Sequence, residues 1–323
     1  MRDEFNIGVD IGGTNIKYGL VSSSGKILYK EIISSGLDRK GFLSNLRKGV
    51  DSLLLFAREK GIKINQIGIG IPGTIDILKG RIYGIPPNLS FLKDFALRKY
   101  LQRYFDYPIF MDNDANVMAL AEHKFGSAKG YKNCICITLG TGIGSGIIIN
   151  GKLFRGSSFV GPEFGHITIC YNGIKCNCGN YGCLEVYASE PAMLKRTKEI
   201  LGKNRTTVLY KLCQGNLNRL KAKDLFQAEK LKDRVARRVI QNTAYYLGTA
   251  LSSIVNLLNP EIVVIGGGVA LFAGKDFIRK IEFEVRKRAF PSATKNLRIV
   301  KAKLGNDAGF IGASILGEEL GAW

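Results

Sequence analysis

Short runs of alternating apolar and polar residues open the chain, and this alternation is typical of β-strands. Three such strands are expected, over residues 6–11, 16–21 and 27–33. Apolar residues then recur every three or four positions between 39 and 60, which predicts an amphipathic helix. A short apolar run over residues 67–71 predicts a further strand, which Pro72-Gly73 would end.

A similar order of elements begins again at residue 134. Strands are expected over residues 134–139, 146–149 and 261–265. The first two enclose the glycine-rich break Gly140–Gly144, and Asn150-Gly151 predicts a hairpin turn because both of its central positions need positive φ. Helices are expected over residues 229–258 and 307–320.

Two strand–glycine–strand hairpins, each followed by helices and further strands, indicate a duplicated α/β domain. A length of 323 residues also suggests two domains. We expect an N-terminal α/β domain over residues 1–118, joined by a C-terminal helix over 307–323. A larger C-terminal α/β domain would occupy residues 119–306.

The chain is strongly basic, with 47 Lys and Arg against 27 Asp and Glu and a net charge of +20. Such a surplus is typical of nucleic-acid-binding proteins, and it also attracts ATP and other anionic metabolites. The basic residues are spread along the chain, however, and the densest groups (195–203 and 230–238) fall in segments with helical spacing. Groups of this kind are usually solvated helix faces, so charge alone identifies no partner.

The N-terminal residues and the cysteines indicate a cytoplasmic protein. No signal peptide is evident, because acidic residues follow Met1 directly, and no apolar run of about 20 residues predicts a membrane span. Three of the 7 cysteines lie within residues 176–183, a spacing that favours metal ligation over disulfides. The others are expected to be small buried residues: Cys134, Cys136, Cys170 and Cys213.

Glycine-rich loops at the ends of three expected strands suggest a nucleotide site. At Asp10–Thr14, backbone N–H groups and a hydroxyl can approach phosphates, and the carboxylate can hold hydrated Mg²⁺. The predicted nucleotide-binding residues are Asp10, Gly12, Gly13, Thr14, Lys17, Thr138, Gly140, Thr141, Gly142, Gly267 and Gly268. Taken singly, each loop is also explained as a tight turn. Together they resemble the phosphate hairpins and adenosine loop of the actin, hexokinase and heat-shock ATPase superfamily, which implies ATP in a cleft between two related domains.

Asn113 and Asp114 precede an apolar helical run that ends near residue 123. Either side chain can cap the start of that helix. Asn113 can also bind sugar hydroxyls, and Asp114 can act as a general base, which the helix N-terminus keeps ionised. Such a base is weak, so most of the rate must come from alignment and from stabilisation of phosphate charge. Gly73 and Asn88 are further candidate sugar contacts.

A segment rich in cysteine and histidine is the most specific feature of the sequence. Four candidate ligands lie within residues 166–183 and match a closed tetrahedral Cys₃His zinc site: His166, Cys176, Cys178 and Cys183. Four protein ligands leave no open position, so we expect a structural zinc that holds Glu163, His166 and Glu185 around the sugar. One ring nitrogen of His166 would bind zinc, and the other would donate to a sugar hydroxyl.

These motifs, in this order and over nearly the whole chain, resemble the ROK family of repressors and sugar kinases. The segment 176–189 is particularly similar to the family's bacterial glucokinases. The resemblance implies ATP-dependent phosphorylation of glucose to glucose 6-phosphate, with Asp114 as the catalytic base, in a homo-oligomer (dimer or tetramer). It also implies sugar binding by Asn113, Glu163, His166 and Glu185, and zinc binding by His166, Cys176, Cys178 and Cys183.

One residue departs from the glucokinase pattern. Glucokinases of the family usually have a glycine before the sugar-binding glutamate, whereas this chain has Pro162, as in the family's fructokinases. Fructose, mannose or an N-acetylated hexosamine is therefore an alternative acceptor. A sugar-responsive transcriptional repressor is an alternative of another class. Asp10 leaves no room before it for the helix-turn-helix of such proteins, so we expect no nucleic-acid partner. An actin-like filament protein would explain the nucleotide loops but not the Cys₃His site.

Overall fold

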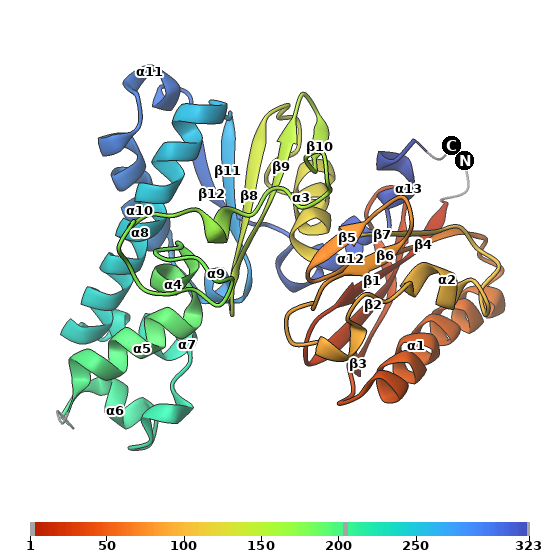
Figure 1. Ribbon diagram of the computed structural model, residues 1–323, viewed down its shortest axis with the longest axis horizontal. Helices are drawn as coiled ribbons and strands as arrows, with labels where there is room; N and C mark the ends of the chain where they lie inside the picture. The colour runs from red at the N-terminus through yellow and green to blue at the C-terminus, as the bar shows by residue number, and fades with distance from the viewer. Residues whose placement is uncertain (1–3, 203–205, 322–323) are drawn as a thin grey trace. The chain divides into compact units, whose positions relative to one another are not determined.

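The computed structural model describes residues 4–202 and 206–321 (Figure 1). Contacts divide the chain into two compact units. Unit 1 comprises Met1–Lys132, Gly146–Pro162 and Asn306–Trp323, and unit 2 comprises Asn133–Ser145 and Glu163–Gly305. Residues 1–3 and 322–323 of the expected N-terminal domain and C-terminal helix, and residue 203 of the basic group, lie outside the described residues. Within the described chain, no helix combines the length and the apolar character that a membrane span requires.

The sheet of unit 1 has the strand order β3-β2-β1-β4-β7. Its strands are β1 (Phe5–Ile11), β2 (Asn15–Ser22), β3 (Ile27–Ser34), β4 (Ile64–Ile71) and β7 (Ile109–Asn113). β2 pairs antiparallel with β1 and β3, whereas β4 is parallel to β1 and β7. The three strands predicted from alternation and the one predicted from a short apolar run are confirmed as β1 to β4, and β7 has no counterpart among the predictions.

Helix α1 (Arg39–Glu59) packs on one face of this sheet and confirms the predicted helix (Figure 1). The Asp38 side chain caps it by accepting a hydrogen bond from the backbone N–H of Gly41 at 2.7 Å. Its buried face includes Phe42, Leu46, Val50 and Leu53. Gly49 lets the helix approach β2, because a Cβ there would lie 2.2 Å from Cζ of Tyr18.

Helix α12 (Ala308–Ala313) packs on the other face. Tyr18 of β2 contacts α1, whereas a Cβ at the next residue, Gly19, would lie 2.2 Å from Cδ2 of Phe310, and successive residues of a strand point to opposite faces. A Cβ at Gly8 in β1 would lie 1.8 Å from the carbonyl oxygen of Phe310. A Cβ at Gly68 in β4 would lie 1.7 Å from that of Ala313. These strand glycines therefore allow helix backbone to lie directly against the sheet.

The prediction of one continuous helix over residues 307–320 is wrong, because the helix breaks near its middle. The segment forms α12 and a separate short helix, α13 (Leu316–Glu319). Buried Gln66 in β4 satisfies the backbone at the break, where its Nε2 donates to the Ser314 carbonyl at 2.6 Å and its Oε1 accepts from the Gly317 N–H at 2.9 Å. A partner so distant in sequence leaves no local signal.

The second five-stranded sheet has the order β10-β9-β8-β11-β12. Its strands are β8 (Cys134–Leu139), β9 (Ile143–Ile149), β10 (Lys152–Phe154), β11 (Ile262–Gly266) and β12 (Arg298–Lys301). β11 is parallel to β8 and β12, and β9 forms an antiparallel hairpin with β10. The predicted turn is confirmed, with φ of 52° at Asn150 and 78° at Gly151. β9 begins at Ile143 rather than at the predicted residue 146.

Unit 2 is rich in helices, and α8 and α10 pack side by side (Figure 1). They are α4 (Glu185–Ala188), α5 (Glu190–Leu201), α6 (Val208–Leu212), α7 (Ala222–Lys230), α8 (Arg234–Leu258), α9 (Gly268–Phe272), α10 (Lys275–Arg288) and α11 (Pro291–Thr294). Short 3₁₀ helices lie at Phe164–His166 and Leu217–Arg219. The smaller elements of unit 1 are β5 (Thr74–Asp76), β6 (Arg81–Tyr83), α2 (Leu97–Leu101), α3 (Asp114–Lys124) and a 3₁₀ turn at Ser90–Leu92. A further 3₁₀ turn, Gly305–Asp307, lies where the chain passes from unit 2 back to unit 1.

The single helix predicted over residues 229–258 is wrong at its start, where α7 ends and α8 begins. Lys232 between them has a φ of 63°, which interrupts the helical backbone. Asp233 then caps α8, because its Oδ1 accepts from the N–H groups of Val235 and Ala236, both at 2.9 Å. Its Oδ2 accepts from the N–H of Val208, so the cap also fixes the start of α6.

Candidate active site

The first glycine hairpin of unit 1 places Asp10 at the end of β1. Lys17 in β2 donates from Nζ to Oδ2 of Asp10 and to the carbonyl oxygen of Asn306, both at 3.2 Å. Gly309 in α12 brings backbone against the carboxylate, since a Cβ there would lie 2.4 Å from Cγ of Asp10. Burial raises the pKa of Asp10, and the attraction of Lys17 lowers it by a smaller amount. Thr14 at the tip of the hairpin is exposed.

Asp10→Asn is expected to leave the ligand-free protein at least as stable as wild type at pH 7. Because the pKa of Asp10 is raised in the folded chain, ionisation of this carboxyl costs stability as the pH rises above its ordinary pKa of 3.8. The advantage of the variant should therefore be largest at neutral pH and disappear below about pH 4. Thermal unfolding of both proteins between pH 4 and 8 measures this difference. A variant clearly less stable at pH 7 would show that the Lys17 ion pair outweighs burial.

Gly73 and Asn88, the two further candidates of unit 1, lie beside different parts of the site. Asn88 has a left-handed φ of 60° and packs on the first hairpin, because a Cβ at Gly13 would lie 2.6 Å from its own Cβ. Gly73 has a φ of 100°, and its carbonyl oxygen accepts a hydrogen bond from Nδ2 of Asn113 at 3.1 Å. Asn88 thus lies next to the predicted phosphate loop, and Gly73 next to the predicted base.

Asn113 ends β7 and caps α3, of which Asp114 is the first residue. The Asn113 Oδ1 accepts from the N–H of Ala115 at 2.8 Å and from that of Asn116 at 3.4 Å. This confirms the capping role that was one of the two interpretations. The Asp114 Oδ1 accepts from the N–H of Ala115 at 2.9 Å, and the side chain remains partly exposed. The helix end therefore carries a partly exposed aspartate among oriented backbone N–H groups.

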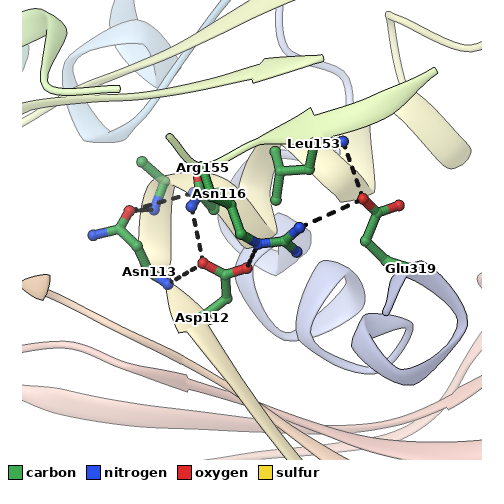
Figure 2. A network of polar contacts seen from close by, with 7 residues as sticks. Asp112, Asn113, Asn116, Leu153, Arg155 and Glu319 are labelled. Carbon is green, nitrogen blue, oxygen red and sulfur yellow. Dashed lines mark hydrogen bonds and ion pairs between the residues drawn. The ribbon is translucent and has the colours of Figure 1, made fainter. Parts of the chain in front are cut away.

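The sequence reasoning missed Asp112, which lies directly before this pair and is only 2% exposed. Its Oδ2 forms an ion pair with Nε of Arg155 at 2.7 Å, and Arg155 in turn faces Glu319 (Figure 2). A carboxylate in a buried strand needs a charged or hydrogen-bonding partner, and that need was the available signal. The partners themselves come from two distant segments, so local sequence patterns do not identify them.

The second and third glycine loops meet in unit 2, because β8 and β11 are parallel neighbours. The Thr138 hydroxyl accepts from the N–H of Gly144 at 3.1 Å, while Thr141 is exposed. Gly267 has a φ of 87°, and a Cβ there would lie 2.4 Å from the backbone nitrogen of Leu139. A Cβ at Gly140 would lie only 4.0 Å from the backbone nitrogen of Gly268, so the two loops lie close together.

The ligand atoms of His166, Cys176, Cys178 and Cys183 lie within 4.8 Å of one another. Cys176 Sγ is 3.7 Å from Nδ1 of His166, and the sulfurs of Cys178 and Cys183 are 3.6 Å apart. Tetrahedral zinc with ordinary bond lengths requires separations of about 3.5 to 3.8 Å between its ligand atoms. The donor set and its spacing therefore fit a structural zinc ion.

The backbone of this loop agrees with a closed metal site. Gly182 has a φ of 71°, and a Cβ there would lie 1.6 Å from the carbonyl oxygen of Cys170, so only glycine allows the turn. Desolvation raises the pKa of the Cys183 thiol to about 12, so metal binding there would have to displace a proton. Cys134, Cys136 and Cys213 are buried as predicted, but Cys170 is exposed, because it lies on the surface of this loop.

Glu163 and Glu185 lie on either side of the cysteine loop in sequence. They are close enough that, besides desolvation, the negative charge of Glu185 raises the pKa of Glu163. Nε2 of His166, the nitrogen that faces away from Cys176, is 4.0 Å from Oε2 of Glu163. Desolvation raises the pKa of Glu163 although 49% of its side chain is exposed, with opposing smaller effects from His166 and Glu185. Glu185 Oε2 accepts from the N–H of Ile143 at 2.9 Å. A Cβ at Gly142 would lie 2.6 Å from that oxygen, so Glu185, a predicted sugar ligand, lies against the second glycine loop.

Comparison with known proteins gives consistent matches along the chain. A glucokinase of Halalkalibacterium halodurans is 37% identical over 319 residues, which are 98% of this chain and 96% of the relative. A xylose repressor of Caldicellulosiruptor bescii is 34% identical over 308 residues, which are 95% of this chain and 76% of the repressor. The crystal structure of a ROK family glucokinase from Streptomyces griseus in complex with glucose and AMPPNP is similar with a TM-score of 0.81. Its identity is 31%, over 97% of this chain and 98% of that one.

The likeness to the Streptomyces griseus structure confirms the expected fold, a mixed α/β architecture of the actin and hexokinase type. The sequence profile of the ROK family matches residues 6–319. This match begins in β1, ends in α13 and passes through both units. The chain therefore belongs to the ROK family.

Proposed function

We propose that the chain is an ATP-dependent hexose kinase that converts glucose to glucose 6-phosphate. The observation that carries this proposal is the end of β7. There Asn113 is fixed between the α3 N-terminus and the Gly73 carbonyl, and the adjacent Asp114 is partly exposed. The similarity to a glucokinase, and to a glucokinase structure with glucose and AMPPNP, supports both substrates.

In the proposed reaction the 6-hydroxyl oxygen of glucose bonds to the γ-phosphorus of ATP. The bond from that phosphorus to the β–γ bridging oxygen breaks, ADP leaves, and Asp114 accepts the hydroxyl proton. Asn113 would orient the sugar beside this base. The hairpin Asp10–Thr14, Lys17 and the loops at residues 138–142 and 267–268 would hold the phosphates and adenosine. Mg²⁺, held through water by Asp10, would supply the positive charge that the triphosphate requires.

Glu163, His166 and Glu185 would bind the remaining sugar hydroxyls. Zinc bound by His166 Nδ1 and the three cysteines would crosslink the loop that carries this set, and with four protein ligands it would take no part in the chemistry. The free Nε2 of His166 would then be the nitrogen that faces the sugar. We also propose that the enzyme is cytoplasmic and forms a dimer or tetramer, which sedimentation of the purified protein would test.

The acceptor is tested by steady-state kinetics with ATP and Mg²⁺ over glucose, fructose, mannose and N-acetylglucosamine. Glucose is expected to give the highest kcat/KM. Pro162 motivates the comparison, because it stands beside Glu163 and is typical of the family's fructokinases. A large preference for fructose would replace glucose as the proposed acceptor. No turnover with any hexose would contradict the proposed kinase activity.

A sugar-responsive DNA-binding protein is the second candidate. The similarity to a xylose repressor and the net charge of +20 favour it, but the match covers only 76% of the repressor. Binding to duplex DNA, measured between about 50 and 200 mM salt, separates the two functions. We expect weak, sequence-independent binding that is lost as the salt concentration rises. Tight binding to one duplex sequence would instead support the regulator.

A further inference from the structure

We infer that Arg155 is a positioning residue that holds the catalytic end of β7 in place through the buried carboxylate of Asp112. The inference rests on the proposed function of Asp114. Arg155 follows β10 directly, and Asp112, Arg155 and the residues that contact them below all belong to unit 1.

Both carboxylate oxygens of Asp112, a residue of a buried strand, accept hydrogen bonds (Figure 2). Its Oδ1 accepts from the backbone N–H of Asn113 at 2.7 Å and from Nδ2 of Asn116 at 2.8 Å. Its Oδ2 accepts from Nε of Arg155 at 2.7 Å. The carboxylate is 3% exposed and the Arg155 side chain 11%, so water screens this pair only weakly.

Asp114 lies between the two residues that Asp112 holds. Asn113 is the cap of α3, and Asn116 lies in its first turn. Because both residues donate hydrogen bonds to the carboxylate of Asp112, the end of β7 and the start of α3 are held rigidly to one another. The position of Asp112 therefore sets where the carboxylate of Asp114 lies.

Arg155 connects this piece to two other parts of unit 1. Its Nη1 is 3.7 Å from Oε1 of Glu319 in α13, and the same oxygen accepts from the N–H of Leu153 in β10 at 3.0 Å. The carbonyl oxygen of Arg155 accepts from the N–H of Gly161 at 3.1 Å, which closes the loop that leads along the chain to Glu163. One residue thus anchors both the base and the segment that precedes a predicted sugar ligand.

A simpler role for Arg155 would be to neutralise a buried charge. Arg155→Met leaves Asp112 buried without its cation, so it should lower the unfolding temperature under either role. Asp112→Asn with Arg155→Met removes both charges and keeps an amide oxygen for the N–H of Asn113. This double variant should recover the unfolding temperature. If Arg155 positions the base, however, it should not recover the rate.

The experiment measures kcat, the KM values for glucose and ATP, and thermal unfolding for wild type and four variants. For the double variant we expect a wild-type unfolding temperature, nearly unchanged KM values and a kcat lower by about 10- to 100-fold, because small displacements of a base are costly. Arg155→Lys should recover part of the kcat and of the unfolding temperature that Arg155→Met loses, since it keeps the positive charge but not the several donors of the guanidinium group. Lys124→Met is the matched control, because it breaks an exposed ion pair with Glu318 that also joins α3 to α13, and its kcat should be unchanged.

Failure of this inference is distinguishable from failure of the proposed function. A double variant that turns over glucose within about twofold of an active wild type would overturn the positioning role. An inactive wild type would instead contradict the kinase proposal. Hydrogen exchange of peptides covering residues 109–118 reports on the Arg155–Asp112 contact independently of turnover. Exchange there should be faster in the double variant than in Lys124→Met. Equal protection in the two variants would also overturn the inference.

Discussion

Asp114→Asn is expected to lower kcat for glucose phosphorylation by about 10³-fold, with little change in the KM for ATP. The amide cannot accept the proton of the 6-hydroxyl, and a positioned general base contributes about 10²- to 10⁴-fold. The fold should persist, because the side chain is partly exposed and its oxygen can still accept from the N–H of Ala115. Steady-state kinetics and circular dichroism on the same preparation measure the two effects.

Asp51→Asn is the matched control for this substitution. Asp51 is exposed on α1, in the same unit, and has no proposed role in the reaction. Its kcat should equal that of wild type. A folded Asp114→Asn protein with near-wild-type activity would remove Asp114 as the base.

Cys178→Ala is expected to abolish zinc binding and to destabilise unit 2. The purified wild type should contain about one zinc per chain, because its four donor atoms lie within 4.8 Å of one another and form a Cys₃His set. Structural zinc in small peptides contributes about 10–16 kcal/mol at pH 7, so loss of one ligand should lower the unfolding temperature strongly. The KM for glucose should rise about 10- to 100-fold, since His166 would lose its orientation. Elemental analysis, thermal unfolding and kinetics measure these changes.

Cys170→Ala is the control for the zinc prediction. Cys170 is exposed on the same loop but is not among the four clustered ligands, so its variant should keep zinc and activity. Treatment of wild type with a chelator should reproduce the Cys178→Ala changes, and added Zn²⁺ should reverse them. A metal-free wild type with full activity and unchanged stability would contradict the zinc site.

The parts of the fold that could be predicted are those that local periodicity determines. β1, β2 and β3 alternate, β4 is a short apolar run, α1 has a helical repeat, and the Asn150-Gly151 turn has a specific backbone requirement. The breaks at residues 231–233 and 314–315 were missed because apolar spacing continues through them. Long-range contacts made by Asp233 and Gln66 stabilise these breaks.

The candidate site divides in the same way. Cysteine spacing predicted a cluster that the structure places within one loop, and short motifs identified both glycine hairpins. The Asp112–Arg155–Glu319 network was not predictable, because its members come from three separate segments. Gly68, Gly70 and Gly73 have the spacing of the nucleotide motif GxGxxG, but the close packing of α12 explains the glycine at 68.

The most direct test of the central claim is a crystal structure with glucose and a non-hydrolysable ATP analogue. The measurement is the distance from the Asp114 carboxylate to the 6-hydroxyl oxygen of the sugar. We predict a hydrogen bond of about 2.6–3.2 Å, with that hydroxyl facing the γ-phosphate. A carboxylate turned away from the sugar, or glucose bound with another hydroxyl toward the nucleotide, would contradict the account.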